Sequence, residues 1–325
     1  MSEQALLEVE NLRIDIVSGS SKHNVVEDVS FTIGAGETFG LVGESGCGKS
    51  ITALSMIGLL RKPLSITDGV IRFKGQDLRS MSSREMRKLR GNRIAMIFQE
   101  PMTALNPLSP VGRQIAEMFV LHQGATWHEA ERKAIEALAS VQVPAPEQRV
   151  KNYPHQMSGG MRQRVMIAIA LACDPDLLIA DEPTTALDVT VQAEILRLMQ
   201  ELCTARGTSV LMISHDLGVI AKMCRRVGVM YAGHLVEQRI TAGLFHHPAH
   251  PYAHGLLAST AARITTKAGQ LRLQEIEGVV PSISAFPKGC RFEPRCTRAT
   301  DICRAQKPGW TPLEDAGVVR CFHHE

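Results

Sequence analysis

The fold is decided by one short stretch, Gly43-Glu44-Ser45-Gly46-Cys47-Gly48-Lys49-Ser50. It matches the pattern G-x-x-x-x-G-K-[ST], in which a glycine-rich backbone turns its N–H groups inward around phosphate oxygens. The apolar run 39–42 before it predicts a strand, and 49–60 after it predicts a helix stopped by Pro63. We expect this loop and the partly positive helix N-terminus to bind phosphates, with Lys49 reaching the β- and γ-phosphates and the Ser50 hydroxyl binding Mg²⁺.

Polar side chains follow three further apolar strands. Asp181 and Glu182 follow the run 177–180, Gln99 follows 94–98, and His215 follows Ser214 at the end of 210–213. Ligands of open α/β sheets bind at the carboxyl ends of the strands. We therefore expect Asp181 to bind Mg²⁺ and Glu182 to polarise the attacking water. Gln99 is expected to coordinate Mg²⁺ or to position water, and His215 to hydrogen-bond the γ-phosphate, although either residue alone fits an ordinary structural role.

A second glycine-containing segment lies far from the phosphate loop in the sequence. It reads Ser158-Gly159-Gly160-Met161-Arg162-Gln163 and opens a predicted helix over 160–172. Ser158 suits the N-cap position, and the first N–H groups of the helix form an anion site. Alone, the segment is an ordinary helix start, but with the phosphate loop it separates this chain from other phosphate-loop proteins.

The order of predicted elements gives the fold class. Strands alternate with helices over 1–75 and 175–240, whereas residues 102–174 are mostly helical. This pattern predicts an α/β fold, a parallel-rich sheet with antiparallel strands and an inserted helical subdomain over about 102–174.

The overall composition restricts the classes of partner that the chain is expected to bind. Aromatic residues make up 4% of the 325 residues and the net charge is +3, which argues against a nucleic-acid binder. The one basic run, from Arg84 to Arg93, fits a solvated helix face better than a phosphate patch. The start Met1-Ser2-Glu3-Gln4 lacks the basic region of a signal peptide, and the longest apolar run, 165–173, is about half a membrane span. Any membrane association is therefore expected to be peripheral.

The composition changes after about residue 240, and residues 276–325 are rich in Pro, Arg and Cys. We predict a domain over 1–255 followed by a small cysteine-rich domain over 256–325. Cys290, Cys296, Cys303 and Cys321 are separated by five, six and 17 residues, without a C-x-x-C pair. Four thiolates suit an iron–sulfur cluster or zinc, and free thiols or disulfides remain the alternative. A metal here is expected to be structural, because a short tail with little periodicity gains folding free energy from it.

Together these motifs resemble the ATPase subunits of ABC transporters, over about residues 5–255. The resemblance rests on the phosphate loop, Gln99, the segment from Ser158, the run 177–182, Ala186-Leu187-Asp188 and His215. It implies a phosphate-loop ABC ATPase core that binds ATP and Mg²⁺, with Glu182 as general base and His215 as switch residue. Two subunits would meet head to tail, so that Ser158 and Gly160 touch the γ-phosphate held by the other subunit and Asp188 lies at the seam.

A narrower resemblance is to the importer branch that handles dipeptides, oligopeptides and nickel. It rests on Gln99-Glu100-Pro101-Met102-Thr103-Ala104-Leu105-Asn106-Pro107, on the segment 158–166, on His250-Pro251-Tyr252 and on the cysteine-rich tail. It implies a related second ATPase subunit in a heterodimer, two membrane permease subunits, a periplasmic or extracellular substrate-binding protein, and a position on the cytoplasmic face of the inner membrane. Residues 99–107 would be the lever that meets the permeases' coupling helices. Related tails bind a 4Fe-4S cluster, which the resemblance implies for the four tail cysteines.

The chain departs from the family pattern at the residue that stacks on the adenine base. The family places an aromatic residue near position 16 to stack on adenine, whereas this chain has Ile16, and His23 is the nearest residue with a ring. We expect Ile16 to make only apolar contact with the base.

Three functions remain open at this point. The first is a transport ATPase of a peptide importer, with a nickel importer as its variant. The second is an ABC ATPase of translation or DNA repair, which would carry two ATPase units or a coiled-coil or zinc-hook insertion. The third is a redox-sensing regulatory subunit, against which the intact set Lys49, Glu182 and His215 argues.

Overall fold

The computed structural model describes residues 5–18, 21–100, 104–185, 187–261, 263–265, 271–273 and 276–324. Pro101, Met102 and Thr103 of the predicted lever, Ala186, and the four N-terminal residues lie outside this description. The chain divides into two units. The first contains Met1–Leu6, Ile33–Glu37 and Ser80–Met212, and the second contains Leu7–Thr32, Thr38–Arg79 and Ile213–Glu325.

The first unit holds buried strands in the order β8-β7-β6. These are β6 (Ile94–Ile97), β7 (Leu177–Asp181) and β8 (Ser209–Ser214). β6 and β7 are parallel, and all residues of β7 and β8 are buried. Uninterrupted apolar runs are typical of strands covered on both faces, so these predicted strands are confirmed.

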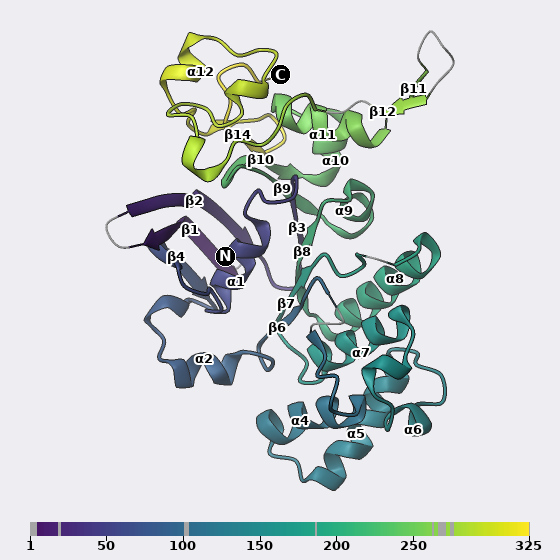
Figure 1. The fold of residues 1–325 in the computed structure, drawn as a ribbon. Coiled ribbons are helices and arrows are strands. Elements are labelled where there is room, and N and C mark those ends of the chain that lie inside the picture. Colours follow the sequence, from purple (N-terminus) through teal and green to yellow (C-terminus); the bar gives the residue numbers. More distant parts are fainter. Residues whose placement is uncertain are drawn as a thin grey trace. The chain divides into compact units, whose positions relative to one another are not determined.

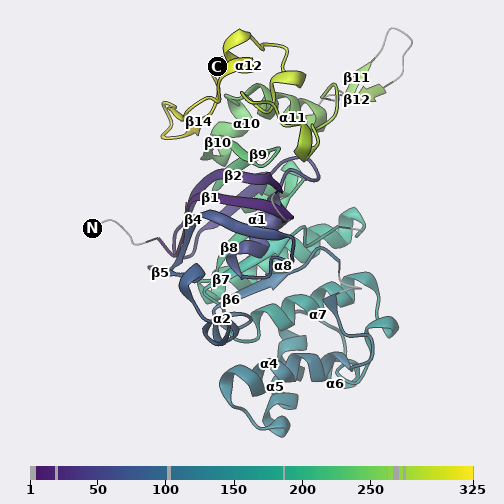
Figure 2. The same cartoon turned by 60° about the vertical axis from the view of Figure 1, so that its left-hand side comes forward.

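Helices make up the rest of the first unit, and Figures 1 and 2 show α4 to α7 gathered together. The helices are α2 (Ser83–Leu89), α4 (Val111–Gln123), α5 (Trp127–Ser140), α6 (Pro146–Arg149), α7 (Gly159–Leu171) and α8 (Val189–Arg206). α5 begins at the predicted residue because Thr126 forms a capping box with Glu129. The predicted helical character of 102–174 is confirmed for the described residues.

The second unit contains two sheets. The antiparallel sheet has the order β2-β1-β4-β5, formed by β1 (Leu7–Ser18), β2 (Ser21–Ile33), β4 (Leu64–Phe73) and β5 (Gln76–Asp77). The other runs β13-β14-β10-β9-β3 within this unit, with β3 (Thr38–Val42), β9 (Arg226–Tyr231), β10 (His234–Ile240), β13 (Thr311–Pro312) and β14 (Val318–Val319). β3 is parallel to β9, whereas β9 and β10 are antiparallel. The mixed sheet therefore combines parallel and antiparallel strands, as predicted.

Asp68 and Gly69 lie inside β4, where the register shifts opposite Asn11. Gly69 has φ +85, and a Cβ there would lie 2.5 Å from the Asn11 carbonyl oxygen. The glycine therefore serves a bulge within a longer strand and not a turn.

The helix after the phosphate loop, α1 (Lys49–Met56), is shorter than the predicted 49–60. Gly58 has φ +60, and its N–H donates to Ser55 O, while Leu59 N–H donates to Leu54 O. A left-handed glycine in this position satisfies the last helical carbonyls and ends the helix before Pro63 is reached.

The C-terminal part of the second unit has little regular structure. Its helices are α9 (Leu217–Met223), α10 (Thr241–His246), α11 (Pro251–Ala261) and α12 (Asp301–Ala305), and β11 (Arg263–Thr265) pairs with β12 (Leu271–Leu273). β14 pairs antiparallel with β10, so the chain beyond residue 276, which we call the tail, adds strands to the sheet. In the described ranges, no helix is both long and apolar enough to cross a membrane.

Candidate functional site

The phosphate loop joins β3 to α1 in the second unit. Its three glycines have positive φ, with +152 at Gly43, +77 at Gly46 and +104 at Gly48. A Cβ on Gly43 would lie 2.1 Å from the Met230 carbonyl oxygen of β9. Only glycine allows this conformation and this close approach, so the backbone of the loop has the shape that the sequence pattern predicts.

Lys49 is the first residue of α1 and is 5% exposed. Its ammonium donates to Gly43 O at 2.8 Å and to Glu44 O at 3.1 Å, and it lies 3.7 Å from Cys47 Sγ. The ammonium is thus held over the loop by main-chain carbonyls. Burial raises the pKa of the Cys47 thiol, so this cysteine stays protonated at neutral pH. Ser45 is exposed, and Ser50 is the second residue of α1.

The first unit brings Gln99 and Glu182 together. Asp181 is the last residue of β7 and is 5% exposed, and Glu182 follows it. The Glu182 carboxylate accepts from Gln99 Nε2 at 3.0 Å and from Thr185 Oγ1 at 2.9 Å. Glu182 also has φ +47, which is costly for a residue with a side chain and is seen most often at functional sites. Two predicted residues, from separate strands, therefore share one hydrogen bond at the carboxyl end of the parallel strands.

The segment from Ser158 opens α7, as predicted. Ser158 is the N-cap, and its hydroxyl accepts from Met161 N–H at 3.3 Å. Gly159 is exposed, and a Cβ on Gly160 would lie 2.9 Å from Val191 of α8. Asp188 is the N-cap of α8 and accepts from the N–H groups of Thr190 and Val191. The starts of α7 and α8 thus lie next to each other, with Ser158, Gly159 and Asp188 at the surface.

The other residues that the sequence places near a bound nucleotide belong to the second unit. His215 follows β8 and is exposed. Ile16 is half-buried in β1 opposite Leu64, and His23 is exposed on β2. A half-buried aliphatic side chain offers apolar surface but no ring.

The four tail cysteines line one small cavity, together with His250 and Phe292. Burial, with added repulsion from the other three thiols, raises the pKa of Cys290 to about 11. Burial also raises the pKa of Cys296 and of Cys321. Across the described ranges, however, no group of three or more His, Cys, Asp or Glu side chains is positioned to hold a metal ion. The four thiols are therefore of a type that binds metals and share one cavity, but they are not arranged around a common point in this structure.

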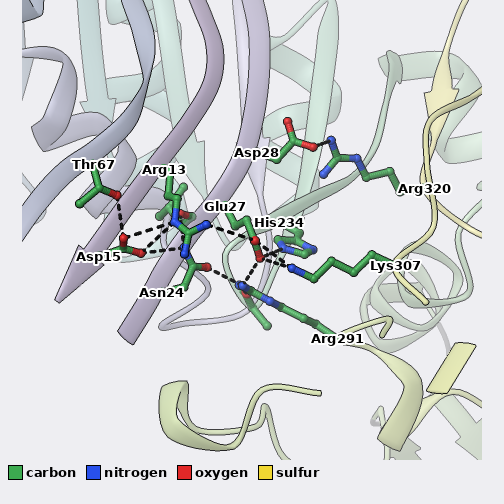
Figure 3. Close-up of polar contacts among 12 residues, drawn as sticks. Arg13, Asp15, Asn24, Glu27, Asp28, Thr67, His234, Arg291, Lys307 and Arg320 are labelled. Atoms are coloured by element: carbon green, nitrogen blue, oxygen red, sulfur yellow. Dashed lines mark hydrogen bonds and ion pairs between the residues drawn. The ribbon is translucent and has the colours of Figure 1, made fainter. Parts of the chain in front are cut away.

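A carboxylate of the N-terminal sheet anchors the tail. Figure 3 shows Glu27 of β2 surrounded by His234, Arg291 and Lys307. Glu27 accepts from Arg291 Nη2 at 2.7 Å, from Lys307 Nζ at 2.8 Å and from His234 Nε2 at 3.0 Å. These hydrogen bonds and charges hold the pKa of Glu27 far below its ordinary value. Arg320, farther along the tail, pairs with the adjacent Asp28.

Aromatic rings fill the space between β9 and the tail. The Tyr231 ring lies 4.7 Å from that of Tyr252 and 5.1 Å from that of Phe292. Edge-on and tilted pairs at these distances add stability beyond the apolar area they bury. Phe292, between Cys290 and Cys296, therefore packs the cysteine segment onto the sheet.

Sequence reasoning missed the residues that tie the tail to the rest of the second unit, chiefly Glu27, Arg291 and Arg295. Their partners lie more than 200 positions away, so no spacing rule finds them. The available signals were the high arginine content after residue 276 and the segment His250-Pro251-Tyr252, which carried no assigned role.

Comparisons with known proteins agree with this geometry. Residues 26–185 match the family described as ABC transporter, and residues 236–303 match that described as oligopeptide/dipeptide transporter, C-terminal region. The dimeric ATP-binding cassette MJ0796, solved in a post-hydrolysis state with ADP and Pi, has a TM-score of 0.65 at 26% identity, over 72% of this chain and 98% of that chain. The fold class predicted from the sequence, an ABC ATPase core with a helical subdomain, is confirmed.

Curated relatives match along almost the whole chain. A probable peptide ABC transporter ATP-binding protein of Sinorhizobium fredii is 50% identical over 98% of this chain and 94% of its own. The oligopeptide transport ATP-binding protein AppD of Bacillus subtilis is 48% identical, over 98% and 97%. The dipeptide transport ATP-binding protein DppD of Escherichia coli is 44% identical, over 98% and 97%.

The residues around Glu27, which include His234, predict that the stability of the fold decreases in acid. Burial lowers the pKa of His234 to about 4, and the nearby cations Arg291 and Arg320 contribute. Between pH 6.5 and 4 the unfolded chain binds a proton at this histidine that the folded chain does not, so stability falls as the pH falls. We expect the free energy of unfolding in urea to decrease by about 2 kcal/mol from pH 7 to pH 5 on account of His234.

The variant His234→Gln is the control, because it keeps an N–H donor for Glu27 but does not titrate. Its free energy of unfolding is expected to change less over the same pH interval. An equal decrease in both proteins would contradict the role assigned to His234.

Proposed function

The chain belongs to the ATP-binding proteins of peptide ABC transporters, and we propose that it hydrolyses ATP to drive the import of dipeptides and oligopeptides. The observation that carries this proposal is a glycine-shaped phosphate loop with Lys49 held over it, in a chain that matches peptide-transport relatives from end to end. A nickel importer is the alternative substrate class. A non-transport ABC ATPase is the alternative activity.

We infer that the phosphate loop binds ATP. Its inward-facing N–H groups and Lys49 would hold the phosphates, and His215 would hydrogen-bond the γ-phosphate. Ser45, Gly46, Cys47 and Gly48 would contribute main-chain N–H groups to the phosphates, and Glu44 would contribute its carbonyl, which holds the Lys49 ammonium. Ser50, Gln99 and Asp181 would bind Mg²⁺, because hydroxyl, amide and carboxylate oxygens are the ligands that this ion prefers.

Glu182 is proposed to act as the general base. The hydrogen bonds from Gln99 and Thr185 fix its carboxylate, which would accept a proton from the water that attacks the γ-phosphate. The γ-phosphoryl group of ATP then passes to that water, and ADP is the leaving group. Because phosphoryl transfer depends mainly on positioning and charge, a fixed carboxylate at a strand end is suited to this task.

Dimerisation is proposed to complete the site. Ser158 and Gly159 are exposed at the start of α7, Gly160 lies against Val191, and Asp188 is exposed beside them. A second ATPase subunit, most simply a related chain in a heterodimer, would place its γ-phosphate against this helix start. Two membrane permeases and a periplasmic or extracellular substrate-binding protein would complete the importer, with this subunit peripheral on the cytoplasmic face of the inner membrane.

Three finer assignments remain proposals. The ATPase domain would comprise residues 1–255 and the tail domain 256–325. Residues 99–107 would transmit the closure of the dimer to the permeases. Ile16 would contact the adenine through apolar surface alone.

The tail cysteines are proposed to hold a 4Fe-4S cluster. The supporting observation is that Cys290, Cys296, Cys303 and Cys321 line one cavity and are paired in no disulfide. Their thiols would have to deprotonate and turn toward a common centre. A bound cluster would supply folding free energy to a segment with little regular structure. Zinc, or free thiols, is the alternative.

The general base is tested by Glu182→Gln. We expect steady-state ATP hydrolysis to fall by about 100-fold or more, because the amide cannot accept the proton, while ATP binding persists. The control is Glu201→Gln in α8, whose side chain is 54% exposed and pairs with Arg197 four residues earlier. Hydrolysis by Glu182→Gln at the wild-type rate would remove this residue from the mechanism.

The cluster is tested by metal and sulfide analysis of anaerobically purified protein. We expect about four iron and four sulfide per chain with broad visible absorbance, lost in Cys303→Ala. Cys203→Ala, which removes a buried cysteine of α8, should retain both. Zinc in place of iron would establish the zinc alternative, and the absence of both metals would leave free thiols.

A further inference from the structure

Glu44 places a carboxylate within the phosphate loop, and this residue is held at two points, by Arg295 of the tail and by Tyr252 of α11. Its carboxylate oxygens accept from Arg295 Nη1 at 2.7 Å and from Arg295 Nη2 at 3.0 Å. Such a two-fold pairing of guanidinium and carboxylate fixes both distance and orientation. The Arg295 side chain is 3% exposed and that of Glu44 is 29% exposed, so the arginine side of the pair is shielded from solvent and from salt.

Arg295 is itself held in place for this contact. Its Nε donates to Glu277 O at 2.9 Å, its Nη2 also donates to Ile276 O at 3.0 Å, and its guanidinium lies 5.8 Å from the centre of the Tyr231 ring. Little side-chain entropy remains to be lost when it binds Glu44. The arginine is therefore a fixed cation that the tail presents to the loop.

The second point of attachment is Tyr252. The Glu44 main-chain N–H donates to Tyr252 Oη at 2.8 Å, and Tyr252 is fully buried. This N–H is committed to the protein and is withdrawn from the set that can face phosphates. The hydroxyl thereby sets the direction in which the loop leaves Gly43.

These contacts have an electrostatic consequence. A carboxylate in a loop that binds a polyanion repels the ligand, and the repulsion grows where the surroundings exclude water. Arg295 neutralises that charge. Without Arg295, the Glu44 carboxylate would also be free to compete with phosphate oxygens for the Lys49 ammonium, which lies on the Glu44 carbonyl.

We propose that Arg295 of the tail and Tyr252 of α11 are positioning residues for nucleotide binding, which neutralise the Glu44 charge and hold the phosphate loop in a form ready to bind phosphates. This inference rests on the proposed nucleotide site. It extends that site to a part of the chain that contributes no phosphate ligand of its own.

The test is the equilibrium affinity of the full-length chain for Mg²⁺-ADP, which needs no hydrolysis step. Arg295→Met is expected to bind about tenfold more weakly, since losing one charge-assisted contact typically has this effect. Arg295→Lys should recover part of the loss through its charge. Arg304→Met is the matched control, because this tail arginine pairs with Glu293 and Asp301 and should bind as the wild type does.

A double variant separates charge from folding. In a Glu44→Gln background, Arg295→Met is expected to change the affinity by less than about threefold, because no carboxylate is left to neutralise. A full tenfold loss in that background would show that Arg295 acts through the fold of the tail and would overturn the proposal. Wild-type affinity in Arg295→Met would overturn it as well.

Two further outcomes are distinguishable. If Arg295→Met does not fold, Tyr252→Phe carries the test, since it removes only the hydroxyl and should bind Mg²⁺-ADP about threefold more weakly. An unchanged affinity in Tyr252→Phe would then overturn the proposal. If the wild type fails to bind Mg²⁺-ADP, the nucleotide site itself is wrong and the inference falls with it.

Discussion

The close approach of Gly43 to the Met230 carbonyl is the constraint on which the rest of the second unit depends. No side chain fits between the loop and β9, because a Cβ on Gly43 would also lie 2.8 Å from Cys47 Sγ. This contact fixes the phosphate loop against a strand whose next residue, Tyr231, begins the aromatic packing with Tyr252 and Phe292. The end of β9 therefore positions both the phosphate loop with Lys49 and the aromatic rings that pack against the tail.

Charged side chains of the tail also connect it to the rest of the second unit. The tail is rich in arginine, and four of its cations face carboxylates elsewhere in the second unit: Arg291 and Lys307 at Glu27, Arg320 at Asp28, and Arg295 at Glu44. Removing one partner of a shielded pair leaves an uncompensated charge and is costly. The tail is thus bound by charge to β2 and to the phosphate loop, and by aromatic packing and the pairing of β14 with β10 to the sheet that carries this loop.

Much of the fold could be predicted from the sequence, because local patterns with fixed spacing specify it. The strands that end at Asp181 and Ser214, the capped starts of α5 and α7, and the loop from Gly43 all lie where periodicity and cap residues indicate. The early end of α1 at Gly58 and the bulge at Gly69 were not predicted: Gly58 adopts a left-handed conformation, and Gly69 lies against Asn11 of another strand. The pairs Glu27–Arg291 and Glu44–Arg295 were beyond prediction for the same reason: tertiary packing, not spacing, brings them together.

The most direct measurement of the central claim is the affinity of Lys49→Ala for ATP, by equilibrium titration in the presence of Mg²⁺. Lys49 is the one cation that the loop itself supplies, and its ammonium already lies over the carbonyls of Gly43 and Glu44. The account predicts a loss of roughly 10- to 100-fold, with the fold retained, because a hydrogen-bonded charge on the phosphates is removed. An affinity equal to that of the wild type would contradict the assignment of residues 43–50 as the nucleotide site.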